Sequence, residues 1–253
     1  MLKFERLRII ENLLYENGSV STSELSKMFD VTEETVRNDL VELQNANKIK
    51  RVRGGAFLIE PVDNEVPITI RNEMLQDEKK SIANICLDYI NPGDTIAIDS
   101  STTANCLAKM IKEAELSVTV ITNSITNGSI LMNSKNVNLI ILGGTLRGKS
   151  NSLVGNITNE SIKKYVINKA FVSCSGLSIP AGPTDTNEQE AKIRENIFYS
   201  SEKNFLLADN TKFDFRTVYL ISDFDSIDYI ITDQKASSEW KDFLAEKKIE
   251  LLY

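Results

Sequence analysis

From about residue 76 to the end of the chain, short apolar runs rich in β-branched residues alternate with stretches of helical periodicity. The runs indicate strands at 95–98, 118–122, 137–142, 170–173, 204–208 and 229–232. The periodic stretches predict helices at 79–89, 103–113, 124–133, 159–165, 188–200 and 238–247. Such alternation is typical of βα units in which helices cover a largely parallel, buried sheet. We therefore expect an α/β domain over residues 76–253 that binds ligands beyond the carboxyl ends of its strands.

A different pattern precedes this domain and predicts a helix-turn-helix over about residues 20–39. A first helix with one apolar face is expected at 4–16. Ser21 and Glu24 have the spacing of a capping box that opens a second, short helix. After a tight turn, Thr32 is expected to cap a third helix that runs to about residue 45. Two short helices separated by such a turn form a helix-turn-helix unit.

The segment after the third helix predicts a β-hairpin whose tight turn is Gly54-Gly55. Strands are expected on either side of this turn, at 49–53 and 56–59. The hairpin is the wing of a winged helix-turn-helix domain expected at residues 3–58. Residues 59–75, with two prolines and several acids, are expected to link the two domains.

The charge distribution favours nucleic-acid binding by the N-terminal domain. The first 57 residues carry nine Lys/Arg and nine Asp/Glu, so the whole net charge of −7 lies in the remainder. Within the neutral part, residues 48–53 (KIKRVR) hold four cations and no acid. Such a cluster is a local footprint for phosphate groups.

Other features of the composition exclude whole classes of function. The chain has no histidine, which excludes Ser-His-Asp and Cys-His nucleophile systems and His-ligated metals. Its three cysteines are scattered and lack a CxxC spacing, so we expect buried thiols and neither metal nor cofactor. No apolar run approaches the length of a membrane span, and the N-terminus is charged where a signal peptide is apolar. We expect a cytoplasmic protein that does not contact membranes.

The third helix carries the residues expected to meet base edges in a major groove. They are Thr32, Glu33, Glu34, Thr35, Arg37 and Asn38. Arg37 suits guanine and Asn38 suits adenine, while Thr35 suits a thymine methyl or a phosphate. On the wing, Lys50, Arg51 and Arg53 are expected to contact phosphates. The alternative is a protein-contact module in which Arg37 pairs with a nearby acid.

Two motifs of this domain are TVRNDL at 35–40 and RVRGGA at 51–56. They resemble the DNA-binding head of the DeoR family of bacterial regulators, whose signature is T-[IV]-R-x-D-L followed by a basic strand and Gly-Gly-Ala. The family commonly has a second arginine in place of Asn38 and a histidine in place of Arg53. The resemblance implies double-stranded operator DNA as a partner.

Polar residues follow several of the expected strands and suggest a ligand site. Asp99 precedes Ser100, Ser101, Thr102 and Thr103 at the start of an expected helix, where free N–H groups favour an anion. Asp99 itself suits sugar hydroxyls, because it would repel a phosphate. The alternative is an ordinary Ser/Thr helix cap. Later strand ends add Thr122, Asn123, Gly143, Gly144, Arg147, Gly176, Asp209 and Lys212, whose glycines allow close approach and whose cations neutralise phosphate.

Eight motifs between residues 71 and 233 resemble the sensor domain of the DeoR family. They are, in order, IDSSTT, VITNS, LGGTLR, VGN, KAFVSCSGLS, EQEAKIR, LADNTKF and IDYIITD. By this resemblance the domain has a Rossmann-like fold of the ribose-5-phosphate isomerase type and senses a phosphorylated sugar. The resemblance implies a site formed by Asp99 to Thr103, Thr122, Asn123, Gly143, Gly144, Glu190, Arg194, Asp209 and Lys212. The family usually has glycine in place of Ser101 and lysine in place of Arg194.

Together these features predict a sequence-specific transcriptional regulator that acts as a homo-oligomer, either dimer or tetramer. Repression relieved by a phosphorylated sugar is the expected mode, and activation stays open. An alternative is an isomerase-like enzyme, with Asp99, Glu190 or Asp209 as general base and Lys212 as electrostatic partner. A winged helix used for protein contact alone is the third possibility. We expect no catalytic residue, because an isomerase has no use for a winged helix.

Overall fold

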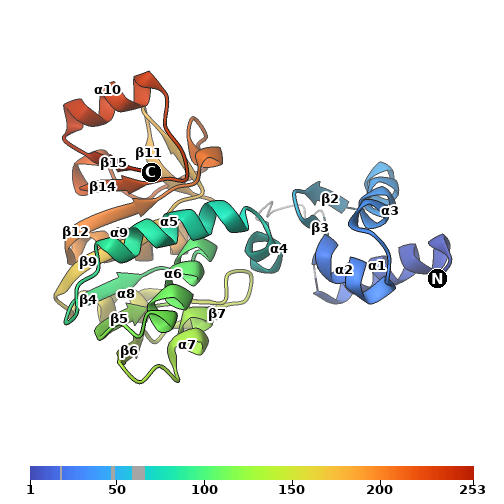
Figure 1. Cartoon of the computed structure of the whole chain (residues 1–253), viewed down its shortest axis with the longest axis horizontal. Coiled ribbons are helices and arrows are strands. Elements are labelled where there is room, and N and C mark those ends of the chain that lie inside the picture. The colour runs from blue at the N-terminus through green and yellow to red at the C-terminus, as the bar shows by residue number, and fades with distance from the viewer. Residues whose placement is uncertain (18, 47–48, 59–65) are drawn as a thin grey trace. The chain divides into compact units, whose positions relative to one another are not determined.

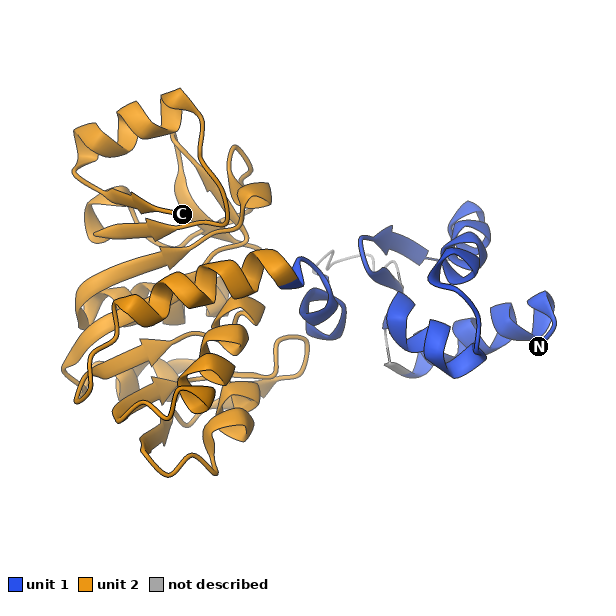
Figure 2. Cartoon of the chain, in the orientation of Figure 1, with its two compact units in different colours: residues 1–76 blue, residues 77–253 orange. Residues whose placement is uncertain are grey.

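The structure is a computed structural model that describes residues 1–17, 19–46, 49–58 and 66–253. It divides into two compact units, unit 1 with residues 1–76 and unit 2 with residues 77–253 (Figure 2). Among the described residues, no helix is both long enough and apolar enough to cross a membrane.

Unit 1 has the winged helix-turn-helix fold that the sequence predicts (Figure 1). Its described elements are α1 (Lys3–Asn17), β1 (Ser19–Ser21), α2 (Thr22–Phe29), α3 (Glu33–Asn45), β2 (Ile49–Val52), β3 (Gly55–Leu58) and α4 (Ile68–Glu73). The three strands form an antiparallel sheet in the order β1-β3-β2. Ile10, Leu25, Val36, Leu40 and Ile49 form the centre of its core, each at most 2% exposed. The core of unit 1 therefore forms where the apolar faces of α1, α2 and α3 pack together.

The sheet of unit 1 differs from the expected hairpin in two ways. Three residues before α2 form the additional strand β1, which pairs with β3 and buries Val20. The turn consists of Arg53 and Gly54, because Gly54 takes the left-handed φ of +96° that a tight turn requires. Gly55 instead lies in β3, opposite Val52.

The stretch expected as a linker contains the short helix α4. Ile68 and Ile70 of this helix are buried, and Ser19 Oγ lies 2.9 Å from Thr69 Oγ1. This six-residue helix was not predicted, because the spacing of Ile68 and Ile70, two positions apart, is not the periodicity of a helix. The remainder of the expected linker, residues 59–65, lies outside the described residues.

Unit 2 contains a seven-stranded sheet whose paired strands are all parallel, in the order β15-β14-β12-β9-β4-β5-β6. Its strands are β4 (Thr95–Ile98), β5 (Val118–Thr122), β6 (Val137–Ile141), β9 (Ile167–Ser173), β12 (Ser201–Leu207), β14 (Tyr229–Ile231) and β15 (Glu250–Leu252). A separate antiparallel sheet has the order β10-β11-β13, from β10 (Gly176–Ser178), β11 (Gly182–Asp185) and β13 (Tyr219–Leu220). A hairpin pairs β7 (Thr145–Arg147) with β8 (Ser152–Val154).

Helices cover both faces of the large sheet (Figure 1). They are α5 (Gln76–Asp88), α6 (Thr102–Glu113), α7 (Ile125–Leu131), α8 (Asn156–Ile162), α9 (Glu188–Tyr199) and α10 (Ser238–Lys247), with 3₁₀ turns η1 (Asn210–Lys212) and η2 (Phe224–Ser226). Neighbouring strand residues point to opposite cores. On β9, Phe171 joins the core that α5, α6 and α7 share, whereas Val172 joins the core of α8, α9 and α10. This two-sided burial confirms the predicted α/β class.

The register of the sheet brings several strand ends to one edge. Ile98 lies opposite both Thr122 and Phe171, so the residues after β4 and β5 leave the sheet together. All six predicted strands and six predicted helices of unit 2 are present, with ends shifted by up to a few residues. The strands of the hairpin, the small sheet and β15 were not predicted, since none of them contains more than two consecutive apolar residues.

Candidate functional site

The N-terminal half of α3 presents polar side chains to solvent. Thr32 is the N-cap residue, and its hydroxyl accepts a hydrogen bond from the N–H of Thr35 at 3.2 Å. Four of the other residues expected to read DNA are exposed, namely Glu33, Glu34, Arg37 and Asn38. Thr35 is partly buried. Val36 and Leu40 point into the core and hold this surface outward.

Arg37 pairs with acids on its own helix. Its Nη2 lies 2.6 Å from Glu33 Oε2, and its Nη1 lies 3.6 Å from Glu34 Oε2. Both ion pairs are about half exposed, so they hold the arginine weakly. The Arg37 side chain is 54% exposed despite these ion pairs.

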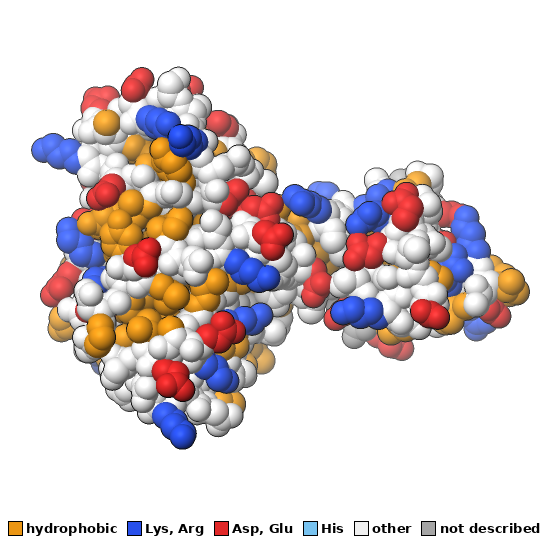
Figure 3. Space-filling view, viewed as in Figure 1, with side chains coloured by type: hydrophobic (Ala, Val, Ile, Leu, Met, Phe, Trp, Pro, Cys, Tyr) orange, Lys and Arg blue, Asp and Glu red, His pale blue; other side chains and the backbone are white. Residues whose placement is uncertain are grey.

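The wing supplies the expected cations. Lys50 and Arg51 lie on β2, and Arg53 lies in the turn, with Lys50 and Arg53 exposed. Lys/Arg and Asp/Glu side chains are interspersed on the visible face of unit 1 (Figure 3). Equal numbers of the two in residues 1–57 agree with this mixture. The unit therefore presents local cations rather than a large basic field.

A buried ion pair that the sequence did not reveal joins α1 to α3. Arg6 donates from Nε to Asp39 Oδ2 at 2.7 Å and from Nη2 to Asp39 Oδ1 at 3.2 Å. The hydrogen bond to Asp39 raises the pKa of Arg6. The acid of the TVRNDL motif is thus buried between α1 and α3 and is not part of the exposed surface of α3.

In unit 2, the carboxylate of Asp99 is the centre of a buried network at the carboxyl end of β4. Its Oδ1 accepts from the N–H and the hydroxyl of Ser101, at 3.1 and 2.6 Å. Its Oδ2 accepts from the N–H of Ser173 at 3.1 Å and from Arg194 Nε at 2.8 Å. Arg194 also forms an ion pair with Asp185 of β11. Three separate segments therefore meet at one carboxylate.

Glu190, in the first turn of α9, is the centre of a second buried network. Its Oε2 accepts from the Ser100 hydroxyl at 3.0 Å, and its Oε1 accepts from Ser150 and Ser152 at 2.6 and 2.5 Å. Arg147 Nη1 lies 3.9 Å from the same oxygen. The β7–β8 hairpin is thereby tied to α9.

The hydroxyl residues after β4 are buried as a group. Ser101 caps α6 by accepting from the N–H of Ala104 at 3.1 Å. Ser100, Thr102 and Thr103 are also buried, each at most 7% exposed. The helix cap that was the alternative to an anion site is thus present, and it lies between the networks of Asp99 and Glu190.

The residues after β5 lie beside this cluster. The Thr122 hydroxyl accepts from the N–H of Ser124 at 3.1 Å, and Asn127 Nδ2 donates to the Asp99 carbonyl at 2.8 Å. Asn123 Nδ2 donates to the Leu153 carbonyl, whereas its buried Oδ1 has no partner among the described residues. A buried amide oxygen without a partner is uncommon in proteins and keeps the capacity to accept a hydrogen bond.

The expected glycines have packing roles. Gly143 and Gly144 form the exposed turn after β6, and a Cβ atom on Gly144 would lie 2.0 Å from Thr158 Oγ1. A Cβ atom on Gly176 would lie 2.6 Å from the Phe215 carbonyl oxygen. Close approach of neighbouring protein atoms thus accounts for Gly144 and Gly176.

Asp209 and Lys212 complete the edge at the end of β12. Asp209 is buried and caps η1 by accepting from the N–H of Thr211 at 3.0 Å. Burial raises the pKa of Cys174 to about 12, while the positive charges of Lys212 and Arg194 act in the opposite direction. The charged groups of Lys212 and Arg194 therefore both lie near the Cys174 thiol, directly after β9.

The structure brings together most of the expected ligand residues and adds four that sequence reasoning missed. The added residues are Asn127, Ser150, Ser152 and Asp185. Ser150 and Ser152 stand in the run KSNSL, whose alternating serines were the available signal. Asn127 and Asp185 gave no signal, because only the fold brings them to the cluster.

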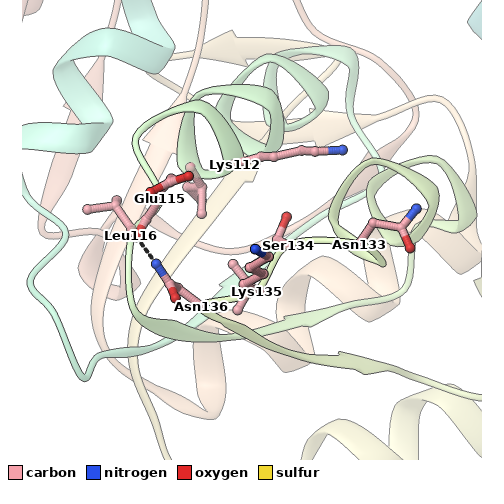
Figure 4. A pocket seen from close by; sticks show the side chains of 9 residues that line it. Lys112, Glu115, Leu116, Asn133, Ser134, Lys135 and Asn136 are labelled. Atoms are coloured by element: carbon pink, nitrogen blue, oxygen red, sulfur yellow. Dashed lines mark hydrogen bonds between the residues drawn. The ribbon is translucent and has the colours of Figure 1, made fainter.

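Two surface pockets lie outside this cluster. One, of about 320 Å³, is lined by residues between the end of α6 and the start of β6, including Lys112, Ser134 and Asn136 (Figure 4). The Asn136 amide closes its wall by donating to the Glu115 carbonyl at 2.8 Å. The other, also about 320 Å³, lies beside Trp240 and Asn210. Neither pocket contains an expected ligand residue.

Among solved structures, ribose 5-phosphate isomerase A of Methanocaldococcus jannaschii is similar to part of this chain. The two align over 55% of this chain and 54% of that chain, with 17% identity and a TM-score of 0.41. No conclusion about activity rests on a similarity of this level.

Sequence comparison covers nearly the whole chain. The DeoR C-terminal sensor domain matches residues 75–234, and the DeoR-like helix-turn-helix domain matches residues 6–62. The transcriptional regulator YulB of Bacillus subtilis is 36% identical over 99% of this chain and 96% of its own length. The transcriptional repressor GlcR of the same organism is 29% identical over the full chain and 96% of its own length. A sensor-domain match over more than half of the chain and relatives aligned end to end show that the chain belongs to the DeoR family.

Proposed function

We propose that this protein is a sequence-specific DNA-binding repressor whose affinity for its operator is lowered by a phosphorylated sugar. The observation that carries the proposal is the buried cluster of Asp99, Glu190 and Arg194 with hydroxyl groups, in a chain that also has a winged helix-turn-helix. The similar protein GlcR is named a transcriptional repressor, which supports repression rather than activation.

The DNA-binding half rests on the surface of α3 and the wing. Arg37 and Asn38 are exposed in the half of α3 that a major groove would receive. Lys50, Arg51 and Arg53 lie on the wing, and we expect them to make phosphate contacts that do not depend on sequence. Glu33 and Glu34 would disfavour binding to DNA sequences on which their carboxylates face phosphate groups.

The sensing half rests on the chemistry of the cluster in unit 2. The N-terminus of α6 offers N–H groups to a phosphate, and Arg147 and Lys212 add positive charge. The unpartnered Asn123 oxygen and the carboxylates suit sugar hydroxyls. Asp99 already accepts four hydrogen bonds, so a sugar hydroxyl would have to replace or share one of them. Binding would therefore rearrange Arg194 and Ser101.

The same hydrogen bonds argue against the isomerase alternative. A general base needs a lone pair directed at the proton that it removes. Asp99 accepts from four donors, and Glu190 accepts from three hydroxyls beside Arg147. Carboxylates engaged in this way are suited to recognition and support more than to proton transfer.

As a mechanism, we infer that a homo-oligomer binds repeated half-sites and that ligand changes the placement of its DNA-binding heads. The largest change in the free energy of operator binding is then set by the ratio of the ligand affinities of the DNA-bound and free forms. Two identical heads on a dimer would match an operator with two half-sites.

Two binding experiments test this function. Fluorescence anisotropy with DNA from the region upstream of its own gene should give specific binding that exceeds binding to scrambled DNA at equal salt. Thermal shift with pentose and hexose phosphates should find a compound that raises the melting temperature, whereas the unphosphorylated sugars and inorganic phosphate have little effect. Absence of any preference for a DNA sequence, or equal response to sugars without phosphate, would contradict the respective half of the proposal.

A further inference from the structure

The short helix α4 is docked on the DNA-binding unit. Its Ile68 and Ile70 side chains are 3% and 0% exposed, and the hydroxyl of Thr69 lies 2.9 Å from that of Ser19 on β1. Burial of the two isoleucines stabilises this position of the helix. The last residue of α4, Glu73, is thereby held at a defined place on unit 1.

The end of α4 lies where the turn of the wing meets the start of α2. The N–H of Thr22 donates to the Gly54 carbonyl at 2.8 Å, so the turn and α2 adjoin. From α2, the hydroxyl of Ser23 donates to Glu73 Oε2 at 2.6 Å. A Cβ atom on Gly54 would lie 3.9 Å from Glu73 Cβ and 3.4 Å from Met74 Cγ. Glu73 therefore contacts α2 and lies against the turn of the wing.

Glu73 places a negative charge next to cations that we expect to contact DNA phosphates. Arg53 directly precedes Gly54 in the turn, and Arg51 lies on β2. Glu73 is exposed, so a phosphate that approaches the turn would meet its charge. Like charges repel, and salt screens this repulsion only beyond about 10 Å at 0.1 M. We therefore expect a wing with α4 docked to bind phosphates more weakly than the same wing with α4 displaced.

A very short connection joins α4 to the helix that follows it. Met74 and Leu75 are the two residues between α4 and α5 (Gln76–Asp88). Leu75 has a left-handed φ of +51°, which is uncommon and strained for a residue other than glycine. A change in the position of α5 would therefore have to be taken up by these two residues or by α4 itself.

We propose that Glu73 is an autoinhibitory acid. In the docked position, α4 holds the Glu73 carboxylate beside the wing, and DNA binds more tightly when α4 leaves this position. The inference deepens the proposed function and rests on it, because it assumes that the wing contacts phosphates and that a ligand acts through the α/β domain. A ligand that favours the docked position of α4 would lower the affinity for the operator.

Anisotropy titrations without ligand test the role of the charge. Glu73→Gln should bind both operator and scrambled DNA about threefold or more tightly than wild type, with a gain that shrinks as salt is raised. Glu16→Gln is the matched control, because Glu16 is exposed at the end of α1 in the same unit, and it should bind like wild type. An unchanged affinity in Glu73→Gln, or an equal gain in both variants, would overturn the proposal.

The scrambled DNA keeps the two claims apart. If wild type showed no preference for the operator, the proposed sequence-specific function would fail. The gain of Glu73→Gln on scrambled DNA depends only on phosphate contacts, so it tests Glu73 in either case.

A reversible cross-link tests whether α4 moves. Ser19→Cys combined with Thr69→Cys replaces two hydroxyls 2.9 Å apart by thiols that can form a disulfide. The native thiols of Cys86, Cys106 and Cys174 are buried, so mild oxidation should join the new pair selectively. The oxidised protein should bind both DNAs about threefold or more weakly than the same protein after reduction. Circular dichroism should show both forms folded, and mass spectrometry confirms the cross-link. Equal binding by the cross-linked and reduced forms would show that DNA binding leaves α4 docked, and would overturn the proposal.

Discussion

The guanidinium of Arg194 donates from Nε to Asp99 Oδ2 over 2.8 Å, although the two residues lie 95 positions apart in the chain. The Arg194 side chain is 6% exposed and that of Asp99 is 1% exposed. Because Arg194 also pairs with Asp185, this single cation compensates two buried carboxylates. Arg194 is therefore expected to affect both the stability of unit 2 and the cluster at which we propose that a ligand binds.

Replacing Arg194 should destabilise unit 2. Arg194→Ala leaves Asp99 and Asp185 without their cation, and loss of one partner of a buried ion pair costs about 3–5 kcal/mol. Arg194→Lys should cost less, since it keeps the charge but cannot bond both carboxylates in the same geometry. Urea denaturation measures the difference. Lys192→Ala, on the exposed side of the same helix, is the control, and a similar loss there would contradict the account.

The ion pair between Arg6 and Asp39 should be essential for unit 1. Asp39→Ala leaves Arg6 buried without its partner, with an expected loss of about 3–5 kcal/mol in the unfolding free energy. The exposed pair of Lys3 and Glu42 also joins α1 to α3 and provides the control. Lys3→Ala should leave the denaturation midpoint nearly unchanged. Equal effects in the two variants would show that burial does not decide the strength of the pair.

Much of this architecture was predictable because long periodic segments reveal buried faces. Helices α1, α2 and α3 of unit 1 and the six alternating strands of unit 2 follow largely from apolar spacing. The α3 surface was predictable for the same reason, since Val36 and Leu40 fix which side faces outward. By contrast, Asp39 has a polar side chain that gives no sign of burial until Arg6 is placed beside it.

The ligand cluster was predictable only in part. Residues directly after strands of the parallel sheet were found, because the carboxyl ends of parallel strands meet at one edge. Asp185 comes from a four-residue strand, and Ser150 and Ser152 come from a short hairpin. Their contacts with Arg194 and Glu190 depend on long-range packing, which local patterns do not record.

Arg37 and Arg51 should affect DNA binding in different ways. Arg37→Ala should cost about 1–3 kcal/mol on the specific operator and reduce the preference over scrambled DNA. Arg51→Ala should weaken binding to both DNAs and lower the slope of log affinity against log salt by about one. Anisotropy titrations at several salt concentrations separate these effects. If Arg37→Ala weakened both DNAs equally, Arg37 would be a phosphate contact.

The Cys174 thiol should stay protonated in the folded protein up to an unusually high pH. Burial raises its pKa from 9.0 to about 12, so the folded chain keeps a proton that the unfolded chain loses above about pH 9. The unfolding free energy contributed by this thiol is therefore full below pH 9 and declines toward pH 12. Denaturation at pH 8 and pH 10 should show a smaller decline for Cys174→Ala than for wild type. The same decline in both proteins would refute the assignment.

The most direct test of the account is the release of operator DNA by a sugar phosphate in wild type, Glu190→Gln and Glu188→Gln. Glu190 is buried within the cluster, whereas Glu188 is exposed on the same turn of α9. Fluorescence anisotropy should show that all three proteins bind the operator. The compound that releases wild type and Glu188→Gln should require at least tenfold higher concentration for Glu190→Gln. Release of Glu190→Gln at the wild-type concentration would place the sensor elsewhere and contradict the central claim.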